Sequence, residues 1–128
     1  MLPNFLMPET VVREEGKGPE CDLGDSPAKL LMLTLGITRI IEQESLDISI
    51  SGSPDKTDWG QRPLISFPQK FYCGTYQILL DLSSRPDIKY LRVQWKVNRW
   101  GRGADKPLFG FYLFAQEAAN QALAAKTA

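Results

Sequence analysis

The sequence predicts a single-domain, all-β protein built as a two-sheet antiparallel sandwich. Its 128 residues fit one domain with one shared hydrophobic core. Short apolar segments recur at regular intervals, most of them with alternating apolar and polar side chains, and turns rich in Gly, Pro and Asp separate them. A single sheet would leave several apolar faces in water, so we expect a second sheet to cover them.

Residues 1–29 are expected to form an N-terminal arm or loop of the same domain, with one short strand at residues 10–13. The rest of this segment is rich in Gly, Pro and acidic residues, which is typical of loops. Residues 1–8 are apolar, but they are too few for a membrane span and prolines interrupt them. We therefore expect no membrane attachment, and a location in the cytoplasm or in a virion or other particle.

The core of the sandwich is expected at residues 30–115. Its strands are predicted at residues 30–41, 46–53, 64–67, 71–73, 75–82, 89–98 and 108–115. Residues 89–98 alternate most regularly, and their pattern places Trp95 between the sheets. Residues 30–41 and 108–115 carry apolar side chains on both faces, as strands covered on both sides do. Residues 116–128 are rich in alanine and are expected to form a helical or flexible tail.

Composition argues against most enzyme classes and against nucleic-acid binding. The chain has no histidine, which removes histidine-activated nucleophiles, histidine metal ligands and the usual general base. Lys and Arg together number 15, as do Asp and Glu, so no overall positive charge attracts nucleic acid. Paired carboxylates are the one remaining catalytic route, at Asp81 with Asp87 or at Glu42 with Glu44. Exposed loop acids are far commoner than catalytic ones, so we expect no enzyme and no cofactor.

The cysteines and the acidic turn each have a simple structural interpretation. Two cysteines without a CxxC motif do not predict a zinc site, and we expect two reduced thiols, with Cys73 buried and Cys21 elsewhere in the chain. Oxygen ligands from Asp47, Asp55 and Asp58 are an alternative calcium site. We favour instead that Asp55 and Asp58 cap their turn while Asp47 lies on the outer face, and we predict no metal.

Aromatic residues in the loops are the candidate binding residues. Trp100 follows a strand end and has Arg99 and Arg102 beside it, while Trp59 follows the acidic turn and Tyr72 lies in a later loop. Indole and phenol rings with nearby guanidinium groups stack on sugars or anchor protein partners. For Trp59 we favour the alternative that it closes one end of the core, and for Trp100 both interpretations stay open.

Residues 46–59 combine a strand, an acidic turn and Trp59 in an order that resembles galactose-binding-like (discoidin-type) jelly rolls. The chain is more similar still to small β-sandwich proteins of phage and prophage gene clusters. The segments that carry this similarity are residues 21–24, 33–38, 53–59, 89–95 and 108–114. Lys56 stands where that pattern has a turn glycine. The resemblance implies a jelly-roll sandwich and a role as a particle component or assembly accessory, and it transfers no ligand residue.

Two functions from different classes follow. The first is a non-enzymatic structural or interaction protein that forms a homo-oligomer or binds other protein subunits, because the strands at residues 30–41 and 108–115 have more apolar faces than one small core needs. The alternative is a carbohydrate-binding module that uses Trp100, Trp59 and Tyr72 with the neighbouring arginines.

Overall fold

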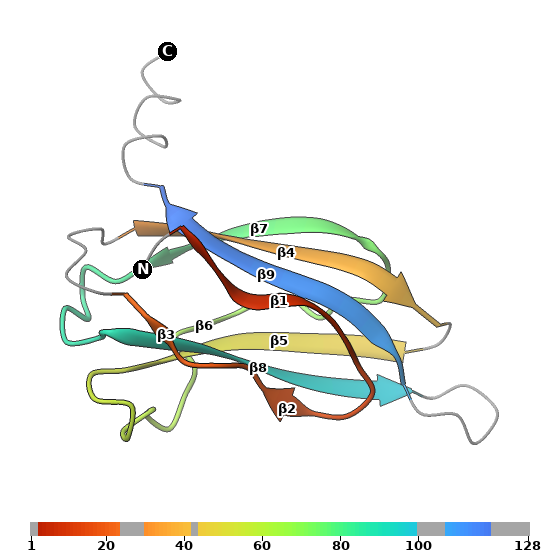
Figure 1. Cartoon of the computed structure of the whole chain (residues 1–128), viewed down its shortest axis with the longest axis horizontal. Helices are drawn as coiled ribbons and strands as arrows, with labels where there is room; N and C mark the ends of the chain where they lie inside the picture. Colours follow the sequence, from red (N-terminus) through yellow and green to blue (C-terminus); the bar gives the residue numbers. More distant parts are fainter. Residues whose placement is uncertain (1–2, 24–29, 42–43, 100–106, 119–128) are drawn as a thin grey trace, which may run out of the picture.

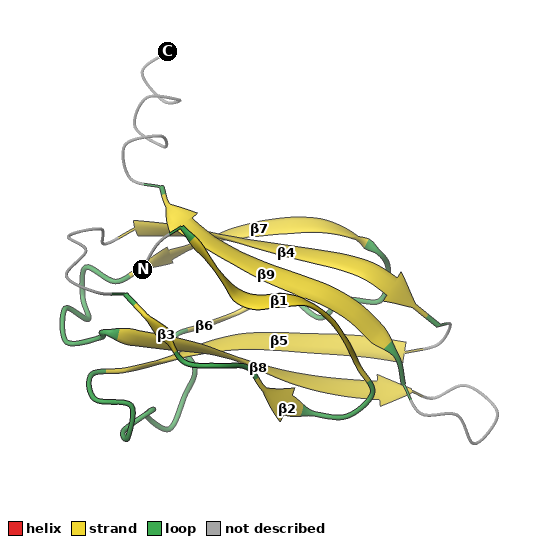
Figure 2. Ribbon diagram, in the orientation of Figure 1, coloured by secondary structure: helices red, strands yellow, loops and turns green. Residues whose placement is uncertain are grey.

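The computed structural model describes residues 3–23, 30–41, 44–99 and 107–118. Within these ranges the chain forms strands, turns and loops, with no helix (Figure 2). The strands are β1 (Asn4–Val12), β2 (Gly16–Lys17), β3 (Cys21–Asp22), β4 (Leu30–Ile40), β5 (Glu44–Ser53), β6 (Ile65–Ser66), β7 (Gly74–Asp81), β8 (Tyr90–Arg99) and β9 (Phe109–Glu117).

The strands form two antiparallel sheets that face each other (Figure 1). The first sheet has the order β1-β9-β4-β7. The second has the order β2-β8-β5-β6. β3 also pairs directly with β8, at Tyr90 and Leu91, whereas β2 pairs with it at Gln94 and Trp95. The all-β sandwich predicted from the sequence is therefore confirmed.

Alternation of side chains explains why the central strands of the second sheet form. In the β5–β8 pair, Ile48 lies opposite Trp95 and Ile50 opposite Val93, and all four side chains are buried. The residues between them point to the other face, because successive side chains of a strand alternate. The predicted alternation of residues 46–53 and 89–98 is thus confirmed.

The core lies between these strands and the central pair of the first sheet, β4 and β9. Phe111 is fully buried, and its ring meets that of Trp95 edge-on with ring centroids 5.5 Å apart. The indole N–H of Trp95 donates a hydrogen bond to the backbone oxygen of Glu14 at 2.9 Å. Trp95 is 7% exposed, so its predicted burial is confirmed.

More of the N-terminal segment belongs to the sheets than predicted. β1 spans nine residues rather than four and pairs with β9 along its length, with Leu6 fully buried. Its register shifts on either side of Met7, next to Pro8, which has no N–H for the ladder. These irregularities break the period-two pattern, so the sequence shows a strand only at the C-terminal end of β1.

The proposed boundaries of the core were also too narrow. β2 and β3 pair with β8 within the segment predicted to be a loop, and Cys21 and Leu23 belong to the core. At the other end β9 continues to Glu117, and the amide of buried Ala118 donates to the oxygen of Leu30 at 3.0 Å. The remainder of the predicted tail, residues 119–128, lies outside the described residues.

Trp95→Ala tests the assignment of inner and outer faces. We expect the variant to lose about 3–5 kcal/mol of unfolding free energy, because it removes a large side chain that joins the two sheets. Lys96→Ala, one position along on the exposed face, should cost less than about 1 kcal/mol. Urea unfolding of both variants measures this difference. Equal midpoints for Trp95→Ala and the parent would mean that the strand faces are reversed.

Candidate functional site

Trp59 does not close the core, which corrects the interpretation favoured from the sequence. It is half-buried on the outer face of the second sheet, where its ring lies 4.1 Å from the guanidinium carbon of Arg92. Its indole N–H donates to the oxygen of Lys56 at 3.0 Å. Arg92 points outward because it alternates with buried Leu91 and Val93, and a guanidinium over an indole stabilises both side chains in that position.

The turn before Trp59 is organised by its own aspartates. One oxygen of Asp55 accepts hydrogen bonds from the amides of Thr57 and Asp58, each at 2.9 Å, and Asp58 accepts one from Gly60 at 3.0 Å. The predicted capping role of these acids is confirmed. Lys56 adopts a φ of 69°, in the left-handed region that favours glycine, which explains why glycine suits this turn position.

The calcium alternative is wrong, because the structure does not bring its three acids together. Asp47 lies opposite Lys96 on β5, whereas Asp55 follows the far end of the same strand. The six residue-to-residue steps from Asp47 to Ser53 extend over about 20 Å. Asp47 instead accepts a hydrogen bond from the Gln69 amide at 3.1 Å. Within the described ranges, no group of three acidic or sulfur ligands is found.

Tyr72 lies far from Trp59, so these two of the predicted aromatic residues do not share one site. Its side chain is 73% exposed, and its backbone oxygen accepts a hydrogen bond from the Tyr76 hydroxyl at 3.3 Å. The bridge from Lys70 to Leu46 places this loop near the start of β5, whereas Trp59 stacks on Arg92 near the end of that strand.

The remaining predicted site residues are Arg99, Trp100 and Arg102. Arg99 is the last residue of β8 and lies opposite Glu44. The side chain of Arg99 and the whole of Trp100 and Arg102 are outside the part of the chain that the structure describes.

The predicted burial of Cys73 is wrong. Both cysteines are free thiols, but Cys73 is exposed and Cys21 is buried against β8. Burial raises the pKa of the Cys21 thiol. Phe71 and Tyr72, beside which Cys73 was expected to be buried, are themselves exposed.

Asp81 and Asp87, the first candidate catalytic pair, instead stabilise the loop between β7 and β8. Asp81 accepts a hydrogen bond from the amide of Ser83 at 2.9 Å, and Asp87 forms an ion pair with Arg85 at 3.2 Å. These partners lower the pKa of both acids, which is opposite to the raised pKa of a general acid.

Glu44 has a different structural task. It is 1% exposed, and its two oxygens accept hydrogen bonds from the amides of Ile41 at 3.1 Å and Leu108 at 2.8 Å. The carboxylate therefore joins the end of β4 and the segment before β9 to the start of β5. Its proposed companion Glu42 lies outside the described residues.

A groove of about 630 Å³ crosses the outer face of the second sheet. Its floor is formed by Asp47 and Ser49 of β5 and by Gln94 and Lys96 of β8. β2 forms one wall and residues 63–67 form the other. Sequence reasoning identified the polar outward positions of β5 and β8 but missed the groove, because its walls include two-residue strands that have no readable pattern.

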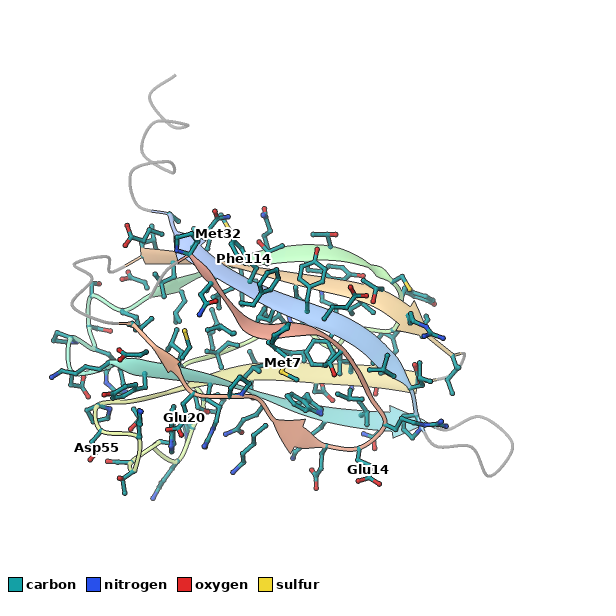
Figure 3. The ribbon with its side chains drawn as sticks, viewed as in Figure 1. Met7, Glu14, Glu20, Met32, Asp55 and Phe114 are labelled. Carbon is teal, nitrogen blue, oxygen red and sulfur yellow. The ribbon has the colours of Figure 1, made fainter. Side chains whose placement is uncertain are left out.

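The outer face of the first sheet carries a group of large apolar side chains. Phe5 and Leu79 are 45% and 44% exposed, and Met32, Tyr112 and Phe114 are half-buried. We call these five residues the outer apolar face. The Phe5 ring packs edge-on against Phe114, with centroids 5.0 Å apart, and against Tyr112 at 6.0 Å. Figure 3 shows Met32 and Phe114 on the side of this sheet that faces away from the second sheet.

One glycine allows this arrangement. A Cβ atom on Gly36 of β4 would lie 2.2 Å from the Tyr112 ring on the neighbouring strand, so only glycine leaves room for the ring to lie flat there. The two-sided apolar pattern predicted for residues 30–41 and 108–115 is present, but within the described chain the outer side is left uncovered.

Asp55 predicts a pH dependence of stability. Hydrogen bonds from the amides of Asp58 and Thr57 lower its pKa in the folded protein. The stabilisation is therefore present at neutral pH and is lost as the pH falls through that lowered pKa. We expect Asp55→Ala to be destabilised at neutral pH and to approach the parent in acid, as measured by urea unfolding across pH. A constant difference at all pH values would contradict this origin.

No protein-family model and no curated protein matches this sequence. Among solved structures, the chain is similar to the crystal structure of the SPBc2 prophage-derived protein YomS, with 10% sequence identity and a TM-score of 0.45. That match covers 91% of this chain and 96% of the other. A likeness of this degree carries no argument about function, and the galactose-binding-like resemblance stays a prediction. No helix within the described ranges is long and apolar enough to cross a membrane.

Proposed function

We propose that this chain is a non-enzymatic structural protein that assembles with copies of itself. The outer apolar face is the observation that carries this proposal. The two sheets of the same molecule differ in the outward residues of their central strands: Ser49 and Gln94 lie on the second sheet, whereas Met32 and Phe114 lie on the first. A contiguous apolar surface on one sheet is typical of a protein contact.

The charge distribution on the first sheet supports a protein partner. The polar residues near the centre of its outer face are uncharged, and the amide of Gln77 donates to the hydroxyl of Thr34 at 3.2 Å. Charged residues lie toward the margins, with Glu9 bonded to Thr38 at 3.2 Å and Asp81 at the end of β7. An uncharged centre that includes large apolar side chains, with charges at the margin, is the usual anatomy of a protein interface.

The strand order supports a particle role by fold-level analogy. We infer a jelly-roll topology, because the chain passes repeatedly between the sheets and gives two interleaved four-strand orders, β1-β9-β4-β7 and β2-β8-β5-β6. Viral capsid subunits and lectins both use jelly rolls, so this topology is compatible with a phage-type particle component and with the carbohydrate alternative.

The interface is tested by charge placed in the outer apolar face. We expect the parent protein to self-associate at high micromolar concentration and Phe114→Lys to lower the average mass, because each contact would then bury an unpaired ammonium group. Gln94→Lys adds the same charge to the polar sheet and should behave like the parent. Sedimentation equilibrium measures the three masses, and a parent that stays monomeric at every concentration excludes the proposed function.

Carbohydrate binding is a second candidate, and the groove rather than the loop aromatics favours it. Its volume suits a small ligand, and its floor offers carboxylate, hydroxyl, amide and ammonium groups, which match the mixed donors and acceptors of sugar hydroxyls.

A glycan array distinguishes the two possible carbohydrate sites. If the groove is the site, Gln94→Ala should abolish binding while Trp100→Ala and Trp59→Ala keep it. Binding that is lost only in Trp100→Ala would place the site at the loop aromatics, and no binding by the parent would exclude the carbohydrate function.

A further inference from the structure

We propose that β7 pairs in antiparallel orientation with β7 of a second copy, so that two four-stranded sheets join into one continuous sheet of both protomers. This inference rests on the proposed self-association and names one contact through which it occurs. The proposed contact uses the edge strand of the first sheet, whereas the outer apolar face lies on the outward side of that sheet.

The four sheet edges differ in how well they are protected from pairing with another chain. In the second sheet, β2 and β6 end the strand order, and each has two residues. In the first sheet, β1 carries Pro8 and two register shifts. Short strands, prolines and bulges are the usual means of blocking edge-to-edge pairing. Three of the four edges are therefore protected.

β7 has none of these features. It spans eight residues without proline, and it pairs with β4 in unbroken register from Leu30–Asp81 to Ile37–Gly74. Asp81, at its last position, is its one charged residue. Within the described ranges β4 is its one strand neighbour. A long and regular edge strand whose one charge lies at its last position is a template for a further strand.

Pairing at this edge would also cover side chains that the single chain leaves half-exposed. Tyr76 and Ile78 point toward the core but are only partly buried, because they lie at the margin of the sheet. The Lys70 ammonium group, 3.9 Å from the ring centroid, already covers part of Tyr76. The midpoint of β7 lies between Gln77 and Ile78.

A two-fold axis at this centre gives acceptable contacts. Side chains that face each other in an antiparallel pair lie on the same side of the sheet, so the axis passes through Gln77 or through Ile78. In the first register Thr75 faces Leu79, and in the second Thr75 faces Asp81. Neither register places Asp81 opposite its own copy, so no like charges meet. A second copy of this chain is therefore a suitable partner.

Disulfide trapping tests the pairing directly. In the full-length Cys73→Ser background, we expect Gln77→Cys or Ile78→Cys to form a disulfide-linked dimer under mild oxidation. Facing Cα atoms at the two-fold axis lie about 4.5–5.5 Å apart, which a disulfide spans. Val11→Cys is the matched control, because Val11, like Gln77, is exposed but lies on β1, and it should stay unlinked.

A charge variant tests the same contact without cross-linking. In the Phe114→Lys background, which removes contacts through the outer apolar face, a dimer should remain. Adding Gln77→Lys should weaken that dimer by about tenfold or more, because both copies then carry an edge lysine. Gln94→Lys, the same exchange on the second sheet, should leave its dissociation constant unchanged.

The outcomes separate this inference from the proposed function. If the parent self-associates but neither cysteine variant cross-links more than Val11→Cys, the β7 contact is wrong and assembly through the outer apolar face stands. If Gln77→Lys and Gln94→Lys weaken the dimer equally, the contact is likewise wrong. A parent that is monomeric at every concentration overturns both.

Discussion

The structure depends on the burial of the inward-facing side chains of two central strand pairs, β4–β9 and β5–β8, which pack against each other. Trp95 and Phe111 meet across this layer, and each large side chain buried there contributes on the order of 1.5–3 kcal/mol against the entropy of ordering the chain. Glu44 adds a polar link between the sheets, because its carboxylate at the start of β5 accepts amide hydrogen bonds from the segment after β4 and the segment before β9. A slip of one residue in any central strand would move its whole apolar set to the outside, so the core fixes the register and with it both outer faces.

The fixed register gives the two outer faces different character. On β5 and β8 the outward positions are polar, and the flanking segments shape them into a groove. On β4 and β9 they are Met32, Phe114 and their neighbours, with Gly36 leaving space for Tyr112. A structural subunit needs a contact surface whose removal from water costs little free energy, and the apolar side chains of the first sheet form such a surface. A ligand with many hydroxyl groups needs donors and acceptors, and the second sheet supplies those. The two candidate functions therefore use opposite sides of the molecule.

Strands with a regular alternation of apolar and polar residues could be predicted from the sequence, and irregular segments could not. β5 and β8 alternate cleanly, so their inner faces, including Trp95, were predicted correctly. β1 was largely missed because its register shifts beside Pro8 interrupt the period on which strand prediction depends. Trp59 was placed wrongly because its position is set by Arg92, 33 positions later in the chain, and no local pattern encodes such a contact. The groove was missed for the same reason, since its walls come from segments that meet only in the fold.

The edges of the first sheet determine what kind of assembly its pairing produces. An open sandwich cannot remove its edges as a closed barrel does, so each edge must be short, bulged, charged or paired. If both edges of the first sheet were regular, copies would add at each side and the sheet would grow without limit. Here Pro8 and its bulges close the β1 side, and only β7 is regular. An antiparallel contact between two copies of β7 uses each regular edge once and leaves two blocked ones. The asymmetry of the edges therefore favours a closed dimer, which displays a doubled apolar surface for further contacts without forming a fibre.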